Sequence, residues 1–265
     1  MLLLLEADHS PQFSWSLVND TISVNGRIVN PDALFIRYDV FTELTAASTG
    51  IPDRANGWYT ATLGWGLTHP KVRLLNRQFL SRIINKPYVL HLARSVGLET
   101  PATLVSNDID TIHDAIRKTP LIAKPVAGGS HCQDIDSVLS NTQTRNGRGA
   151  MPCIIQSRLV SPEIRIYNIA GEFFAFELQS EALDYRTDPN CKILPLALSE
   201  LPPALLSKLA ELMGRLNMNF GAADFKTSST SGSLQFLELN SAPMFVAFDN
   251  KIGGRIADAI LNYLL

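Results

Sequence analysis

Hydrophobic positions recur at intervals of three and four residues in some stretches of the chain and alternate with polar positions in others. The most regular helical pattern covers Pro203–Leu216, where apolar side chains share one face of an amphipathic helix. Less regular spacing of the same kind predicts three more helices. One begins near Val72, one covers Asp108–Lys118, and one begins near Arg255. A further helix is predicted to start at Asn85-Lys86-Pro87 and to stop near Gly97, because proline is tolerated in a first helical turn and glycine often follows the last.

Short apolar runs predict the strands. In the N-terminal part, Asn25-Gly26 lies between two such runs and predicts a two-residue hairpin turn, because both turn positions need a positive φ. The other predicted strands are Leu2–Glu6, Ala33–Tyr38, Leu121–Val126, Cys153–Ser157, Ile164–Ile169, Glu172–Leu178, Gly221–Lys226 and Leu234–Asn240. Two polar stretches, Thr45–Pro70 and Ser140–Gly149, are predicted to be loops. These elements predict an α+β fold with antiparallel hairpins rather than a wound parallel sheet.

Composition excludes several classes of protein. The chain has 265 residues, of which 46% are hydrophobic, so it is neither disordered nor collagen-like. Its 23 basic and 25 acidic residues give a net charge of −2, and without a basic excess we expect no nucleic-acid partner. The apolar run Leu2–Leu5 ends at Glu6 and is too short for a signal peptide or a membrane span, so we expect a cytoplasmic protein with no membrane partner. Three scattered cysteines without a CxxC pair favour free thiols over a zinc cluster or a disulfide framework.

A group of oxygen-bearing side chains is predicted near the C-terminus. In the run Phe236–Asn240, strand alternation places Glu238 and Asn240 on one face. If the strand that carries Asp224 is the hairpin neighbour, Asp224 joins them and three oxygen donors share this face. Such a set suits Mg²⁺, which proteins usually hold with one or two carboxylates plus substrate phosphates. The alternative is a solvated strand face on which the polar residues gather by chance.

A lysine inside an apolar strand is the second chemical signal. Lys124 lies in the predicted strand Leu121–Val126, where losing water is costly unless an anion is near. The following Gly128-Gly129-Ser130 can bring backbone N–H groups close to a phosphate. The alternative is an edge strand whose lysine reaches out to solvent. The chain has neither the Walker A spacing nor GxGxxG, so the common nucleotide-binding motifs are absent from the sequence.

Taken singly, Lys86, Glu163-Ile164-Arg165 and Asp184-Tyr185-Arg186 are ordinary patterns of surface charge. Their order along the chain, however, resembles the ATP-grasp fold, and within it the RimK-like glutamate ligases and the ligases that crosslink microviridin-type (graspetide) precursor peptides. The ordered set is Lys86, Lys124 with its glycine turn, Gln156, Glu163, Arg165, Asp184-Tyr185-Arg186, Asp224, Glu238 and Asn240. The segments Asn217–Phe225 and Phe236–Asn240 are the closest local matches, and the resemblance covers about Lys71 to the C-terminus.

The resemblance implies two α+β subdomains that clasp ATP and a short N-terminal β-rich domain, with domains over residues 1–70, 71–160 and 161–265. The nucleotide-binding roles it implies are Lys86 and Lys124 at the ATP phosphates, Gly128, Gly129 and Ser130 as a mobile lid, Gln156, Ser157, Arg158 and Leu159 as the hinge at adenine, and Glu163 at the ribose. It also implies that Mg²⁺, or Mn²⁺ in its place, is held by Asp224, Glu238 and Asn240. Arg165 and Arg186 would face the reacting carboxylate and the transferred phosphate.

The activity that the resemblance implies is ATP-dependent ligation of a carboxylate to an amine or a hydroxyl through an acylphosphate, with release of ADP and phosphate. The acid would belong to an amino acid, a small natural product or a peptide. One alternative is a graspetide-type macrocyclase that crosslinks a ribosomal precursor peptide, and another is a catalytically inactive ATP-grasp binding module. The chain has Ser241-Ala242-Pro243-Met244 where the family usually has proline directly after the asparagine, so the sequence leaves the class of substrate open. We expect a homodimer or a higher homo-oligomer.

Overall fold

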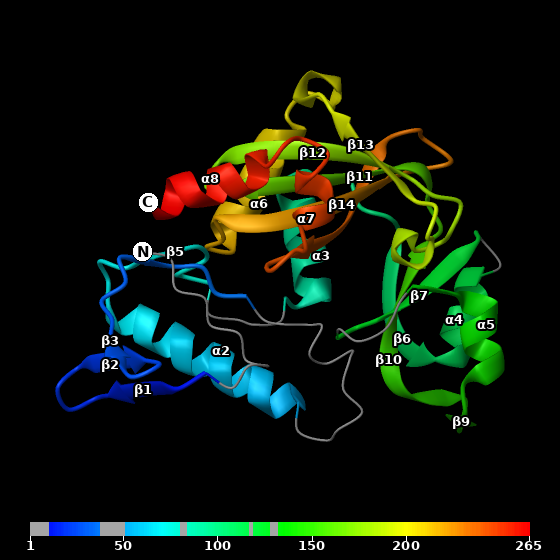
Figure 1. Ribbon diagram of the computed structural model, residues 1–265. Helices are drawn as coiled ribbons and strands as arrows, with labels where there is room; N and C mark the ends of the chain where they lie inside the picture. Colours follow the sequence, from blue (N-terminus) through cyan, green and yellow to red (C-terminus); the bar gives the residue numbers. More distant parts are fainter. Residues whose placement is uncertain (1–10, 38–50, 80–83, 117–118, 128–131) are drawn as a thin grey trace. The chain divides into compact units, whose positions relative to one another are not determined.

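The computed structural model describes residues 11–37, 51–79, 84–116, 119–127 and 132–265. The chain forms two compact units, one made of Met1–Arg77 with Ile260–Leu265 and the other of Gln78–Ala259 (Figure 1). The division into domains at 1–70, 71–160 and 161–265 stays a prediction. Each unit is described by itself below.

The first unit contains an antiparallel sheet of β1 (Phe13–Ser16), β2 (Thr21–Val24) and β3 (Arg27–Ile28), and a parallel pair of β4 (Ala33–Leu34) and β5 (Arg73–Leu74). Asn25 and Gly26 have φ angles of 51° and 74°, which confirms the predicted hairpin turn. The core of this unit is built around Ile22, Trp65 and Val72. The predicted strand Leu2–Glu6 lies outside the described residues.

Two predictions for the first unit are wrong. Most of the predicted loop Thr45–Pro70 is helix α2 (Ile51–Thr68), and the helix predicted from Val72 is instead strand β5 followed by a turn, as far as residue 79. One of the glycines that suggested a loop, Gly66, has a packing role, because a Cβ there would lie only 2.9 Å from a Leu74 methyl carbon. Tertiary packing therefore overrides the low helix propensity of this stretch.

The second unit contains two antiparallel sheets. The β10 sheet has the strand order β6-β10-β7-β8, with β9 paired to β10. Its strands are β6 (Thr103–Asp108), β7 (Leu121–Pro125), β8 (Gln133–Asp134), β9 (Thr144–Arg145) and β10 (Arg148–Ser157). Helices α4 (Ile109–Ile116) and α5 (Ile135–Asn141) pack against it through apolar residues that include Ile112, Ile135 and Ile155.

The polar stretch Ser140–Gly149 is not the loop that its composition predicts. It contains the last turn of α5 and a hairpin between β9 and β10, whose turn is formed by Asn146 and Gly147 with φ angles of 53° and 72°. This is the same Asn-Gly turn as in the N-terminal hairpin. Because the flanking residues here are polar, no alternation of apolar and polar residues predicts the two strands.

The β11 sheet has the order β13-β12-β11-β14-β15. Its strands are β11 (Val160–Ile169), β12 (Glu172–Gln179), β13 (Lys192–Leu196), β14 (Phe220–Thr227) and β15 (Leu234–Asn240), with the short 3₁₀ helices η2 (Tyr185–Thr187) and η3 (Leu198–Glu200) between them. Helices α3 (Lys86–Ser95) and α6 (Leu205–Arg215) bury their apolar faces in one core with this sheet. The predicted α+β class with antiparallel hairpins is therefore confirmed.

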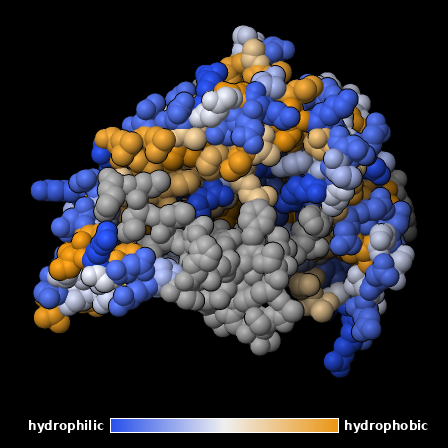
Figure 2. Space-filling model, viewed as in Figure 1, coloured by the Kyte–Doolittle hydropathy of each residue, from blue (hydrophilic) through white to orange (hydrophobic). Residues whose placement is uncertain are grey.

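The chain ends with the short helix α7 (Val246–Asp249) and with α8 (Arg255–Leu264). The α8 helix buries Ile256, Ile260 and Leu264 as its spacing predicts. Hydrophobic side chains also gather on the surface over α8 (orange in Figure 2), where Leu261 and Leu265 are exposed. Within the part of the chain that the structure describes, no helix combines the length and the apolar character needed to cross a membrane.

The start of α3 matters for the site because Lys86 is its first residue. The side chain of Asn85 accepts a hydrogen bond from the Tyr88 backbone N–H at 3.0 Å, and Gly97 follows the last turn with φ of 80°. Both predicted ends of this helix are confirmed. The cap fixes the first turn and with it the backbone position of Lys86.

Replacing Asn85 by alanine is expected to lower the free energy of unfolding by about 1 kcal/mol, because the Tyr88 N–H loses its acceptor. Replacement by serine, which also caps helices, should cost only a few tenths of that. Urea unfolding of the two variants measures the difference. Equal losses in both variants would show that the cap contributes nothing.

Candidate functional site

A charged cleft opens within the second unit and encloses about 710 Å³ of space that is continuous with solvent. Its walls come from β7 of the β10 sheet, from α3, from β11, β14 and β15, and from η2 with the two residues before it. The charged residues that line it are Lys86, Lys124, Glu163, Arg165, Asp184, Arg186, Asp224, Lys226 and Glu238. Nine charged side chains around one opening point to a highly charged ligand.

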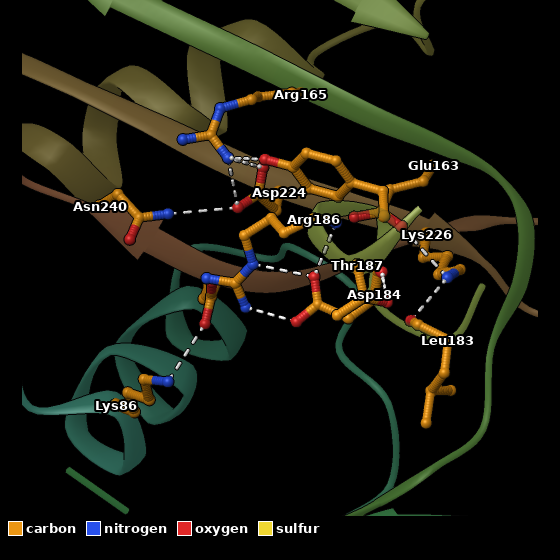
Figure 3. Close-up of polar contacts among 12 residues, drawn as sticks. Lys86, Glu163, Arg165, Leu183, Asp184, Arg186, Thr187, Asp224, Lys226 and Asn240 are labelled. Atoms are coloured by element: carbon orange, nitrogen blue, oxygen red, sulfur yellow. Dashed lines mark hydrogen bonds and ion pairs between the residues drawn. The ribbon is translucent and has the colours of Figure 1, made fainter. Parts of the chain in front are cut away.

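The acidic side of the cleft is built from two neighbouring strands. Asp224 on β14 and Glu238 on β15 are direct cross-strand partners, and both line the cleft. The Asn240 amide donates a hydrogen bond to Asp224 Oδ2 at 3.2 Å (Figure 3). Strand alternation placed Glu238 and Asn240 on one face, and the pairing of β14 with β15 brings Asp224 beside them, with Asn240 reaching the cleft through Asp224.

Two lysines lie opposite these carboxylates. Lys86 Nζ lies 3.3 Å from Glu238 Oε2, and Lys124 lines the cleft from β7. Burial opposes ionisation of Glu238, but the positive charges of Lys86, Lys124 and Arg186 together lower its pKa below the ordinary value. Both lysines therefore face the acidic pair, which is where a negatively charged ligand would meet them.

Arg165 is the buried counter-ion of Asp224. Its Nη1 donates to both carboxylate oxygens of Asp224, at 3.0 and 3.1 Å, and only about 7% of the Arg165 side chain is exposed. Its guanidinium also donates to the hydroxyls of Tyr167 and Tyr185, at 3.0 and 2.9 Å. Burial raises the pKa of Asp224 to about 7 although Arg165 acts to lower it. The arginine and its partners thus fix the Asp224 carboxylate in one orientation.

Arg186 is held differently and remains accessible. Asp184 clamps it through two side-chain hydrogen bonds, of 2.8 Å to Nε and 2.6 Å to Nη2 (Figure 3), and these bonds raise the pKa of Arg186. About 46% of the Arg186 side chain is nevertheless exposed, while it lines the cleft. A permanently charged guanidinium with open space in front of it can meet an anion.

The predicted hinge Gln156–Leu159 is only partly at the cleft. Leu159 lines it, whereas Gln156 is buried and donates to Thr103 Oγ1 at 3.0 Å. The side-chain oxygen of Gln156 has no hydrogen-bond partner among the residues that the structure describes. Arg158 forms a half-exposed ion pair with Asp134 at 3.7 Å. The predicted lid residues Gly128, Gly129 and Ser130 lie outside the described residues.

Several cleft residues were not singled out from the sequence. The clearest is Lys226, whose Nζ lies 3.1 Å from Glu163 Oε2, and which shares the Asp224 face because it lies two residues further along β14. Alternation on β14 could have found it. Tyr167, which is buried behind the cleft and donates to the Met244 carbonyl oxygen at 2.6 Å, gave no comparable signal because its partner is far away in sequence.

The donor set at Asp224 and Glu238 fits a magnesium ion. Two carboxylates directly opposite each other on neighbouring strands repel, and a bound cation relieves that repulsion. Among the residues described, no group of three or more His, Cys, Asp or Glu could hold a metal alone. Two carboxylates and an amide leave coordination positions for phosphate oxygens and water, as Mg²⁺ commonly requires.

The two sheets, the cleft between them and the order of the charged residues define the ATP-grasp fold, and the comparison with solved structures confirms it. PsnB, an ATP-grasp ligase solved with a minimal precursor, Mg and ADP, is 22% identical with a TM-score of 0.71, over 96% of this chain and 85% of PsnB. The macrocyclase MdnC from Microcystis aeruginosa MRC, bound with the precursor peptide MdnA, is 17% identical with a TM-score of 0.71, over 96% of this chain and 86% of MdnC. D-alanine–D-alanine ligase from Bacillus anthracis, complexed with ATP, is 16% identical with a TM-score of 0.54, over 77% of this chain and 70% of that ligase. No protein-family model matches the sequence, and no curated protein matches it significantly.

Proposed function

We propose that this protein is an ATP-dependent ligase that joins a carboxylate to an amine or a hydroxyl. The observation that carries the proposal is the arrangement of Lys86 and Lys124 opposite Asp224 and Glu238 in one cleft of an ATP-grasp fold. Cations that face a pair of carboxylates suit the triphosphate of ATP together with a bridging divalent ion.

The chemistry explains why the site needs these charges. A carboxylate is a poor acyl donor, because its leaving group would be oxide. Transfer of the γ-phosphoryl group of ATP to the carboxylate gives an acylphosphate, which an amine or hydroxyl attacks with phosphate as the leaving group. In phosphoryl transfer the protein mainly positions the reactants and neutralises charge. Lysines, arginines and a metal site meet that need.

The roles proposed for the nucleotide-binding residues follow their positions. Lys86 and Lys124 neutralise the phosphates, Leu159 packs near the adenine, and Glu163 accepts from the ribose hydroxyls. The other proposed hinge residues, Gln156, Ser157 and Arg158, do not line the cleft and would act through the backbone position of Leu159. Asp224, Glu238 and Asn240 hold Mg²⁺ or Mn²⁺, which when bound neutralises phosphate charge and orients the transferred group. Gly128, Gly129 and Ser130 are proposed as a lid that excludes water from the acylphosphate.

The two arginines are proposed to act at the reacting centre in different ways. Arg186 is half-exposed at the cleft wall and binds the reacting carboxylate or the transferred phosphate. Arg165 lines the cleft as well, but its strongest contacts orient Asp224, so it acts on the reaction mainly by fixing the metal-binding carboxylate.

A peptide is the favoured substrate class. PsnB and MdnC, the neighbours solved with precursor peptides, align over 96% of this chain, whereas the D-alanine–D-alanine ligase aligns over 77%. This favours a graspetide-type macrocyclase that crosslinks a precursor peptide over a ligase of amino acids or small natural-product acids. An inactive binding module is disfavoured, because such a module would have no need for Lys86, Lys124, Asp224 and Glu238 together. A homo-oligomer remains our expectation for the assembly.

The experiment that tests this function is a product analysis with Mg²⁺-ATP and a panel of acids and amines, from single amino acids to peptides rich in Asp, Glu, Lys, Ser and Thr. We expect ADP and phosphate to appear only with a suitable acid, and the peptide product to lose one water per new bond. Formation of AMP and pyrophosphate would exclude the acylphosphate route. Absence of any nucleotide turnover across the peptide panel, with ATP still bound, would favour the binding module.

A further inference from the structure

Two ion pairs with opposite orientation lie side by side on the cleft face of the β11 sheet. On adjacent strands, Glu163 of β11 is the direct partner of Lys226 on β14, and Arg165 of β11 is the direct partner of Asp224 on β14. Both pairs are closed, at 3.1 Å for Lys226 to Glu163 and 3.0 Å for Arg165 to Asp224. All four side chains line the cleft. The proposed function uses three of them and leaves Lys226 without a role.

Lys226 is too buried to be an ordinary surface lysine. Its relative exposure is 9%, equal to that of Glu163, so both charges are largely removed from water and each stabilises the other. Its Nζ also lies 3.4 Å from the Leu183 carbonyl oxygen (Figure 3), which belongs to the segment that leads into Asp184 and Arg186. The Lys226 ammonium group therefore connects Glu163 on β11 with the segment that carries Arg186.

We propose that Lys226 is a positioning residue of the nucleotide site, which acts by holding the Glu163 carboxylate in the orientation that accepts the ribose hydroxyls of ATP. The inference rests on the proposed function, since it needs ATP in the cleft and its ribose at Glu163. The ion pair engages Oε2 of Glu163, and a carboxylate has a second oxygen with further acceptor capacity. The lysine thus restricts the rotamers of Glu163 without occupying the oxygen that would meet the sugar.

A purely structural lysine and a positioning lysine have different signatures. If Lys226 only stabilised the sheet, its removal would weaken the binding of all adenine nucleotides by the same factor. If it acts through Glu163, its removal weakens ATP more than analogues that lack a ribose hydroxyl, because only ATP makes the full set of hydrogen bonds. The informative quantity is therefore the ratio of dissociation constants, which does not require turnover.

The test is isothermal titration calorimetry, in which Mg²⁺-ATP, Mg²⁺-2′-deoxy-ATP and Mg²⁺-3′-deoxy-ATP are each titrated into the full chain. It gives a dissociation constant for each nucleotide. We expect the unsubstituted protein to prefer ATP over at least one deoxy analogue by about tenfold or more, as loss of a hydrogen bond to a charged group commonly gives. Lys226→Met should reduce that preference to less than about threefold, and Lys226→Arg should retain most of it. In a protein that already carries Glu163→Gln, adding Lys226→Met should not change the preference further.

A matched control is Lys208→Met, since Lys208 also donates to a loop carbonyl oxygen, that of Gly97 at 2.8 Å, but is not among the residues that line the cleft. It should leave the preference unchanged. If Lys226→Met does not fold, Lys226→Gln keeps a donor for Leu183 and should show the same direction of change.

Three outcomes would overturn the proposal. An unchanged ATP preference in a folded Lys226→Met or Lys226→Gln variant would make Lys226 structural only. Binding of ATP without any preference over either deoxy analogue would remove Glu163 from the ribose. Failure of the unsubstituted protein to bind ATP at all would refute the proposed function itself, and is thereby distinguished from the other two.

Discussion

Replacing Glu238 by glutamine is expected to reduce ADP formation by at least about 100-fold, because even the outer partners of a metal ligand contribute about 10–100-fold and Glu238 is proposed to be a direct ligand. The fold should remain intact. The side chain keeps its shape, and the loss of the ion pair with Lys86 at 3.3 Å is offset by relief of the repulsion from Asp224. Steady-state rates of ADP release measure the loss of activity, and urea unfolding measures the stability of the fold.

The matched control is Glu172→Gln, which makes the same substitution at an exposed position on β12 of the same sheet. That variant should keep the rate of the unsubstituted protein. If Glu238→Gln retained more than about a tenth of the ADP-forming rate at saturating Mg²⁺, the assignment of Glu238 as a metal ligand would be wrong.

The largest loss of stability is expected from Arg165→Met. This substitution leaves the Asp224 carboxylate, about 6% exposed, buried without its counter-ion, and it removes the donors to Tyr167 and Tyr185. Breaking a buried ion pair from one side costs about 3–5 kcal/mol, because the remaining charge is unpaired. Urea unfolding of the variant measures the loss.

Two comparisons separate this effect from the loss of a surface charge. Arg215→Met removes an arginine from an exposed pair with Glu211 on α6, with 45% and 51% side-chain exposure, and should cost less than about 1 kcal/mol. Combining Arg165→Met with Asp224→Asn removes the unpaired charge and should recover part of the stability. A loss in Arg165→Met no larger than that in Arg215→Met would contradict a buried counter-ion role.

The sequence was most informative where structure is local. Alternation in Leu234–Asn240 predicted that Glu238 and Asn240 share a face, and the hairpin from β14 to β15 then brought Asp224 beside them. Pro87 predicted the start of α3, because tolerance of proline in a first helical turn depends only on the adjacent residues. Each of these features depends on neighbours in the chain, which the sequence displays directly.

The features that were missed depend on partners far away in sequence. The stretch that became α2 carries glycines and polar residues, and its helix is stabilised by the packing of Trp65 with Ile22 of β2 and with Val72. Lys226 and Glu163 meet only because β11 and β14 are neighbours in the sheet, although 63 residues separate them in the chain. The pattern within either strand does not state which strands pair, so the ion pair could not be predicted from it.

The most direct test of the account is a crystal structure of the protein with Mg²⁺ and a non-hydrolysable ATP analogue. The account predicts that the triphosphate lies between Lys86 and Lys124 on one side and a magnesium ion at Asp224 and Glu238 on the other, with the ribose at Glu163. A nucleotide bound elsewhere on the chain, or a metal ion that contacts neither Asp224 nor Glu238, would contradict it.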